Sequence, residues 1–80
     1  NLSSLNLYEN KLERLPETIG ELKNLSSLYL IENELERLPE SIKKLASTLK
    51  KLYLGDNPVW NNQEEMRKIR SWLPNTRISW

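Results

Sequence analysis

Three acidic residues occupy the same place in successive stretches of the chain and are the first candidates for chemistry. Glu9, Glu32 and Asp56 each lie one residue before an asparagine, in the stretches YEN, IEN and GDN. Stacked carboxylates can bind a hard cation such as calcium, which takes about six to eight oxygen ligands. A single file of side chains rarely supplies that many. We therefore expect a solvated acidic edge and no metal site.

Serine hydroxyls are the other candidates for chemistry, as nucleophiles. A serine nucleophile needs a neighbouring base and a group that orients the base. The chain contains no histidine and no cysteine, and its only two glycines, Gly20 and Gly55, cannot build a phosphate-binding loop. These absences favour a chain that is not an enzyme and that binds no cofactor.

An internal repeat must position these residues. NLSSLNLYENKLERLPETIGELK, from Asn1, aligns with NLSSLYLIENELERLPESIKKLA, from Asn24, and a third, partial unit begins at Thr48. A fixed period of this length is typical of stacked repeats. We divide the chain into units 1–23, 24–47 and 48–59, followed by a tail over residues 60–80.

Each unit combines two periodicities. Leucine alternates with polar residues in SSLNLYE, which predicts a half-buried strand, whereas apolar residues recur every three or four positions in LERLPETIGEL. Because Pro16 and Pro39 stand early in that second segment, the return arm is a short helix, a 3₁₀ turn or an irregular arc. Stacking in a parallel sheet would place equivalent leucines in two inward rows: Leu5, Leu28 and Leu52, then Leu7, Leu30 and Leu54.

Over residues 1–59 the units follow LxxLxLxxNxLxxLPxxIxxLxx, and they resemble leucine-rich repeats of the 23-residue type, common in bacterial and intracellular eukaryotic proteins. The resemblance implies an α/β fold: a curved leucine-rich repeat solenoid with a short parallel sheet on its concave side. It also implies a role in binding other proteins through that face.

One asparagine recurs at the end of each expected strand, amid apolar neighbours. A bend there leaves backbone groups without sheet partners, and an asparagine amide can both donate and accept to pair them. We expect a structural ladder rather than ligand contacts from Asn10, Asn33 and Asn57.

The outward face of the expected sheet is the better candidate for function. Side chains alternate along a strand, so the neighbours of the inward leucines point outward. Tyrosine is enriched at binding hot spots, although tyrosines on adjacent strands can also stack simply to support the sheet. The residues that we expect to contact a partner are Asn6, Tyr8, Tyr29, Ile31, Lys51 and Tyr53.

The tail departs from the repeat. Asn62 and Glu65 resemble a helix capping box, and Pro74 would end a helix over about residues 63–73. A short final strand over about 77–80 would follow. This order resembles the C-terminal tails of some bacterial leucine-rich repeat proteins, including those of spirochaetes. We interpret the tail as a helical cap that closes the core, with contributions from Trp60, Met66, Ile69, Trp72, Leu73, Ile78 and Trp80.

The first unit begins without a capping segment. Leu2, Leu5, Leu7 and Leu12 would then line an open edge. We expect the chain to be the C-terminal part of a longer protein, or to associate with another copy of itself through that edge. No apolar run is long enough for a membrane span, no signal peptide is visible, and the compartment stays open.

A non-enzymatic module that binds a protein partner is therefore the leading interpretation. Two alternatives stay open: a structural segment of a larger scaffold whose binding face lies upstream, and a regulatory segment linked to a catalytic domain. Residues 1–42 are net acidic and residues 43–80 net basic, but neither part is basic enough to indicate a nucleic-acid partner, despite basic residues at Lys43, Lys44, Lys50, Lys51, Arg67, Lys68 and Arg70.

Overall fold

The computed structural model describes residues 3–80, so Leu2 of the expected N-terminal edge lies outside the described residues. The other members of that edge, Leu5, Leu7 and Leu12, are partly buried against the core. The elements follow the order β1 (Ser4–Asn6), η1 (Glu17–Glu21), β2 (Ser27–Tyr29), η2 (Glu40–Leu45), β3 (Lys51–Tyr53), η3 (Pro58–Asn61), α1 (Gln63–Trp72) and β4 (Arg77–Ser79). The η elements are 3₁₀ helices.

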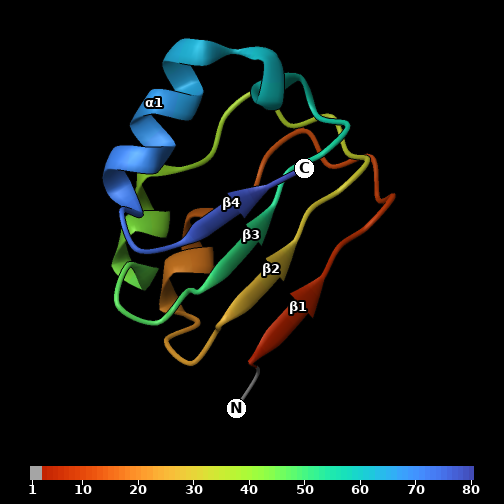
Figure 1. The fold of residues 1–80 in the computed structure, drawn as a ribbon. Helices are drawn as coiled ribbons and strands as arrows, with labels where there is room; N and C mark the ends of the chain where they lie inside the picture. The colour runs from red at the N-terminus through yellow and green to blue at the C-terminus, as the bar shows by residue number, and fades with distance from the viewer. Residues whose placement is uncertain (1–2) are drawn as a thin grey trace.

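Within residues 3–80, four strands form one parallel sheet in the order β1-β2-β3-β4, so each coil lies beside the next (Figure 1). The register pairs Leu5 with Leu28, Leu28 with Leu52, and Leu52 with Ile78. This register confirms the solenoid that the leucine pattern predicts. The tail adds the fourth strand beside β3, with Ile78 packed against the core.

The return arms are 3₁₀ helices, which resolves the alternatives left open by the sequence. Pro16 and Pro39 immediately precede η1 and η2, with φ of −69° and −70° and an extended ψ. Proline holds φ in that range, so it starts the arm without joining it. Ile19 and Ile42 then turn inward, where both are buried. The arms pack against each other on the side away from the sheet (Figure 1).

The core is a stack of leucine rows closed at one end by the tail. Leu28, Leu30, Leu52 and Leu54 are fully buried between the sheet and the return arms. On the last coil, Ile69 and Leu73 continue this layer and are buried as well. Because a 3-residue strand and a short arm cannot bury leucines alone, the coils depend on one another for stability.

Helix α1 begins at a side-chain cap. The Asn62 carbonyl oxygen Oδ1 accepts hydrogen bonds from the backbone amides of Glu64 and Glu65, at 3.1 and 3.2 Å. Such a cap satisfies donors that the first helical turn leaves without partners. Met66 and Ile69 are the buried residues of the helix. The C-terminal helical cap is thus confirmed, and no helix of residues 3–80 is long and apolar enough to cross a membrane.

Two of the repeated asparagines bridge neighbouring coils. Asn57 Nδ2 donates to the carbonyls of Leu30, Leu54 and Gly55 at 2.7–3.1 Å, and its Oδ1 accepts from the Leu35 amide at 3.1 Å. Asn33 bridges to the preceding coil in the same way, donating to Leu7 at 2.8 Å. Their side chains therefore pair backbone groups that the bend after each strand removes from the sheet.

Asn10 departs from the expected ladder. It is exposed, and its backbone amide, rather than its side chain, takes part by donating to Asn33 Oδ1 at 2.9 Å. Asn33 and Asn57, by contrast, are only 6% and 3% exposed to solvent. In the described residues the ladder consists of the two buried side chains of Asn33 and Asn57.

Candidate functional site

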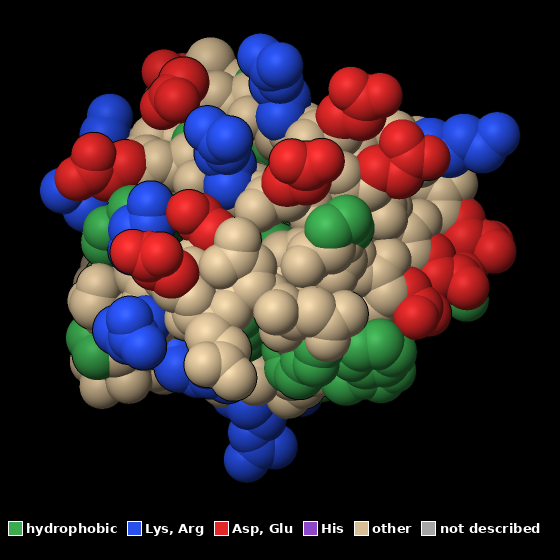
Figure 2. All heavy atoms as spheres, turned by 90° about the horizontal axis from the view of Figure 1, so that it is seen from above, with side chains coloured by type: hydrophobic (Ala, Val, Ile, Leu, Met, Phe, Trp, Pro, Cys, Tyr) green, Lys and Arg blue, Asp and Glu red, His purple; other side chains and the backbone are tan. Residues whose placement is uncertain are grey.

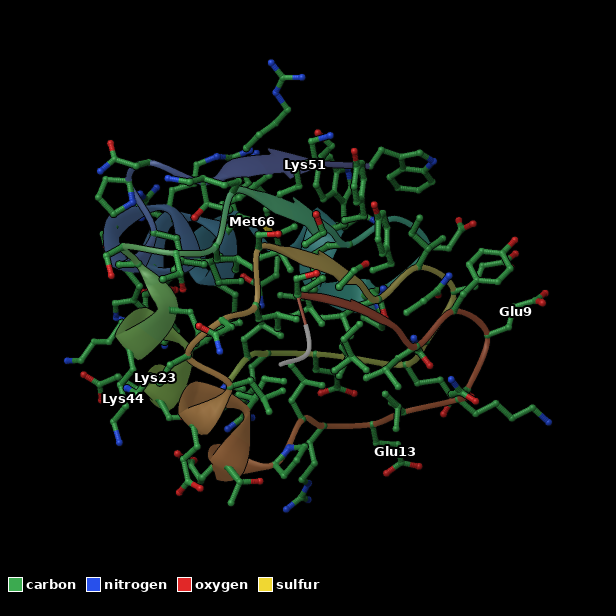
Figure 3. The ribbon with its side chains drawn as sticks, turned by 90° about the horizontal axis from the view of Figure 1, so that it is seen from below. Glu9, Glu13, Lys23, Lys44, Lys51 and Met66 are labelled. Carbon is green, nitrogen blue, oxygen red and sulfur yellow. The ribbon has the colours of Figure 1, made fainter. Side chains whose placement is uncertain are left out.

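The outward side chains of the four strands form one surface, which we call the sheet face. Register places Asn6, Tyr29, Tyr53 and Ser79 in its central row. A second row, at the amino ends of the strands, consists of Ser4, Ser27, Lys51 and Arg77. The sheet face therefore crosses all four coils, and Figure 3 shows Lys51 on it.

The central row is built around two stacked rings. The centroids of Tyr29 and Tyr53 lie 4.9 Å apart with only 5° between the ring planes. Both rings are half-buried, so each supports the other across the sheet. The stacking that the sequence left as an alternative is therefore present, and it leaves the outer surface of the two rings fixed in place.

Tyr8 and Ile31 lie just beyond the central row, at the carboxyl ends of their strands. Tyr8 retains 47% of its exposure, whereas Ile31 is half-buried. Asn6 accepts a hydrogen bond from the Tyr8 backbone amide at 3.0 Å through its side-chain oxygen. Asn6 therefore positions Tyr8.

Trp80 adds a large aromatic side chain to the sheet face. The tail tryptophans Trp60 and Trp72 pack partly buried against the core, but Trp80 retains 57% of its exposure. A Cβ added to Gly55 on the sheet face would lie 3.0 Å from the Trp80 indole, so this ring occupies the space above Gly55. Trp80 departs from its expected role as a cover of the leucine layer, because it lies outside the sheet.

Beyond the carboxyl ends of the strands, the chain bends through the left-handed region at each acidic position. Glu9, Glu32 and Asp56 have φ of 56°, 61° and 55°. Backbone hydrogen bonds hold these bends: the Glu9 amide donates to Ile31 at 3.0 Å, and the Glu32 amide donates to Gly55 at 2.9 Å. Figure 2 shows acidic side chains over much of the visible face, with one group at the right next to hydrophobic side chains.

Glu32 perturbs two of its neighbours at this edge. A side-chain hydrogen bond with Glu32 and the negative charge of the same carboxylate raise the pKa of Tyr8, and the same two causes raise the pKa of Glu9. Glu32 Oε1 is buried and has no hydrogen-bond partner in the described part of the chain. The edge therefore carries more negative charge than its own neighbours neutralise.

Charge is thus divided along the strands. Lys51 and Arg77 lie at the amino ends, and the three acids lie beyond the carboxyl ends. The stacked tyrosines lie between the two groups. Figure 3 shows Glu9 projecting outward from the molecule, well apart from Lys51.

A large hollow lies away from the sheet face. It has a volume of about 610 Å³ and runs along the loops between the strands and the return arms, where acids and arginines alternate: Glu13, Arg14, Leu15, Glu17, Glu34, Glu36, Arg37, Pro39 and Pro58. In residues 3–80, no group of acidic side chains is placed to hold a metal ion. We place no site in this hollow, since mixed exposed charges of this kind are normally solvated.

Besides Ser4 and Ser27, the sheet face contains three residues of the tail that were not among the expected contacts. Arg77 and Ser79 extend its rows through β4, and Trp80 adds its indole. Alternation along the last strand predicts that Arg77 and Ser79 point outward, because Ile78 between them points inward. Nothing in the local pattern indicates the position of Trp80, which depends on the missing side chain of Gly55.

Comparison with known proteins supports this architecture. A family model described as "Leucine rich repeat" matches residues 1–59. Among solved structures, the chain is similar to a leucine-rich repeat protein of Leptospira interrogans, with a TM-score of 0.86 and 40% identity over 94% of this chain. The matched part is 18% of the length of that protein. Comparison with curated protein sequences found no match.

Proposed function

This chain belongs to the leucine-rich repeat family, and we propose that it is a non-enzymatic module that binds a protein partner through its sheet face. The observation that carries the proposal is the exposure of Tyr8 and Trp80, the large hydrophobic side chains that residues 3–80 leave most open to solvent. Both flank the Tyr29–Tyr53 stack, so apolar area gathers on one surface instead of being scattered.

Aromatic side chains suit this role for two physical reasons. Tyrosine and tryptophan offer large apolar areas with a polar group at one end, and they recur where binding energy is concentrated. The parallel stack of Tyr29 and Tyr53 also holds both rings in one orientation before a partner arrives. A fixed surface loses less conformational entropy on binding than a mobile one.

The charge division would orient a partner on this surface. Acidic groups of a partner would lie over Lys51 and Arg77, and basic groups would lie over Glu9, Glu32 and Asp56. Complementary charges of this kind accelerate association and exclude wrong orientations more than they add affinity. We therefore expect the association rate to fall as salt is added, with a smaller change in the dissociation rate.

The test is a selection of binders from a displayed peptide library on the immobilised protein, followed by affinity measurements on sheet-face variants. Tyr8→Ser is the sharpest variant, because Tyr8 is exposed and lies outside the ring stack. We expect it to weaken the selected binders by about tenfold, as for a hot-spot residue. Tyr29→Ser should weaken them further and also lower the melting temperature.

The control variant is Glu36→Ser, at an exposed residue of the large hollow, away from the sheet face. It should leave both the affinity and the melting temperature nearly unchanged. Binders that tolerate Tyr8→Ser, Tyr29→Ser and Trp80→Ser as well as they tolerate Glu36→Ser would rule out the sheet face as the binding surface.

A structural segment of a larger scaffold is the second candidate. The observation that favours it is that the chain spans only 18% of the length of the matched Leptospira interrogans protein. In this alternative the tyrosine stack stabilises the sheet, and partners bind to other coils. Failure of the isolated chain to select any binder dependent on Tyr8 would favour it.

A further inference from the structure

A second hollow lies at the cap, between η3 and α1. It has a volume of about 460 Å³ and is lined by Trp60, Gln63, Met66, Arg67 and Arg70. The hollow is open to solvent, so a small ligand would lie against its wall and stay partly exposed. None of its lining residues belongs to the sheet face, although its Trp60 packs against the sheet-face residue Trp80.

One side of this pocket is apolar and held in position. The Trp60 indole meets the Trp80 indole edge to face, with centroids 5.6 Å apart and 72° between the planes. Met66 retains only 4% of its exposure, and Figure 3 shows it within the body of the molecule. A flat apolar group entering the pocket would therefore meet an aromatic ring and a thioether that are already packed.

The other side is cationic. Arg67 and Arg70 are exposed and lie three residues apart on α1, so they project from one side of the helix. The ion pairs found in residues 3–80 are Lys43–Glu40 and Lys68–Glu65, and neither arginine takes part in them. Among the described residues, no acidic side chain lines the pocket.

The helix dipole explains a cation at only one of these two positions. A cation in the last turn of a helix interacts favourably with the helix dipole, and Arg70 is in that turn. Arg67 lies in the middle of α1, where this effect is weak. A guanidinium group donates paired hydrogen bonds that match the geometry of a carboxylate or a phosphate.

We propose that the cap pocket binds an anionic group, a carboxylate or a phosphate, that is attached to a flat apolar group. Arg67 and Arg70 bind the anion, and Trp60 and Met66 contact the apolar part. Gln63 offers one further donor and acceptor at the rim. This combination distinguishes the pocket from a general basic surface, which would have no apolar wall beside its charges.

The experiment titrates the full chain with phenylacetate, with phenyl phosphate, and with phenylacetamide, the neutral analogue of the first. The readout is the set of three indole N–H signals in a nitrogen–proton NMR spectrum, with Trp60 assigned from Trp60→Phe. Both anions should shift the Trp60 signal in a saturable way, and phenylacetamide should bind about tenfold more weakly because charge-assisted hydrogen bonds are lost. Whichever anion binds more tightly identifies the anionic group of the natural ligand.

Matched variants separate the pocket from general electrostatics. Arg67→Gln and Arg70→Gln should each weaken both anions several-fold. Lys68→Gln is the control, because it removes the same charge from the residue between them, which pairs with Glu65 at 3.0 Å and does not line the pocket. Equal binding of phenylacetamide, an equal loss with Lys68→Gln, or a Trp60 signal that none of the probes shifts would overturn the proposal.

Discussion

At the scale of single residues, the bends after β2 and β3 each contain a buried asparagine and an acidic residue, and the two have different effects. Asn33 and Asn57 replace backbone partners that the bends remove, so their burial is compensated by hydrogen bonds. The acids Glu32 and Asp56, which precede them in sequence, lie in the same bends, and a hydrogen bond with Glu32 together with its negative charge raises the pKa of the neighbouring Glu9. One bend therefore contributes both to stability and to the charge of the candidate site.

We expect Asn57→Ala to destabilise the chain strongly. The substitution would leave the carbonyls of Leu30, Leu54 and Gly55 and the amide of Leu35 without this partner. A buried polar group left unpaired costs up to about 1–3 kcal/mol. We expect the free energy of unfolding to fall by about 2–4 kcal/mol in total. Urea unfolding measures it.

Asn10→Ala is the matched control for that measurement. The Asn10 side chain is exposed, and its backbone amide, which bonds Asn33, is kept in the variant. The change in unfolding free energy should stay within about 0.5 kcal/mol. Similar losses from the two substitutions would show that burial does not decide the contribution of these asparagines.

Because of the acidic edge, we expect the stability of the fold to depend on pH. Because the folded chain raises the pKa of Glu9 above its ordinary value of 4.5, it retains a proton that the unfolded chain has released. In that pH window the folded state binds more protons, so this residue makes stability fall as pH rises and recover as pH falls. Glu40 acts in the opposite sense at lower pH, since Lys43 lowers its pKa and its contribution is lost on acidification.

Glu32→Gln tests the origin of this effect. It removes the negative charge of Glu32 and weakens the hydrogen bonds that its carboxylate makes, so the pKa of Tyr8 and that of Glu9 should move back toward their ordinary values. NMR titration of the two side chains measures this. Glu34→Gln, at an exposed residue nearby, is the control. Unchanged titration curves in Glu32→Gln would contradict the assignment of the cause to Glu32.

At the scale of elements, the strands and return arms are short, and their boundaries are set by residues at their ends. Each strand has only three residues, and each return arm begins after a proline or at one. Helix α1, by contrast, has ten residues and its own side-chain cap.

We expect Asn62→Ala to weaken α1. The loss of two hydrogen bonds to the first-turn amides should cost about 0.5–2 kcal/mol, the usual range for removing an N-cap. Circular dichroism during thermal unfolding measures it. The neighbouring Asn61→Ala removes an exposed amide that does not cap the helix and should have little effect. Equal losses in the two variants would mean that the cap contributes nothing.

At the scale of the whole molecule, the tail closes one end of the solenoid. It supplies β4 beside β3 and places Leu73, Ile69 and Ile78 against the last leucine layer. The exposed Trp80 is different, since it lies on the sheet face. The tail therefore both covers the core and extends the candidate binding surface.

Deletion of residues 72–80 should cause unfolding or aggregation. The deletion exposes Leu52 and Leu54, which are fully buried in the intact chain, along an unpaired edge of β3. Light scattering during size-exclusion chromatography and a thermal melt measure the result. Removal of Trp80 alone should be tolerated far better. A monomeric 1–71 chain with an unchanged melting temperature would disprove the closing role of the tail.

Much of the fold could be predicted from residue types alone. Alternating leucines indicate which strand faces are buried, and an equal period in successive units determines which residues meet across the sheet. Leu5, Leu28 and Leu52 pair as expected for this reason. The capping asparagine and Pro74 similarly mark the ends of α1, because both act through their immediate neighbours.

The remaining features depend on contacts between residues distant in sequence. The environment of an asparagine depends on the coil beside it, so Asn10 and Asn57 share a repeat position but differ in burial. Trp80 lies on the sheet face because Gly55, twenty-five positions earlier, leaves room for its ring. The sequence by itself determined the repeat, the inward rows and the family. Only the tertiary structure decided which aromatic rings stay exposed and which charges gather, because burial and electrostatic interactions depend on spatial neighbours that no local pattern specifies.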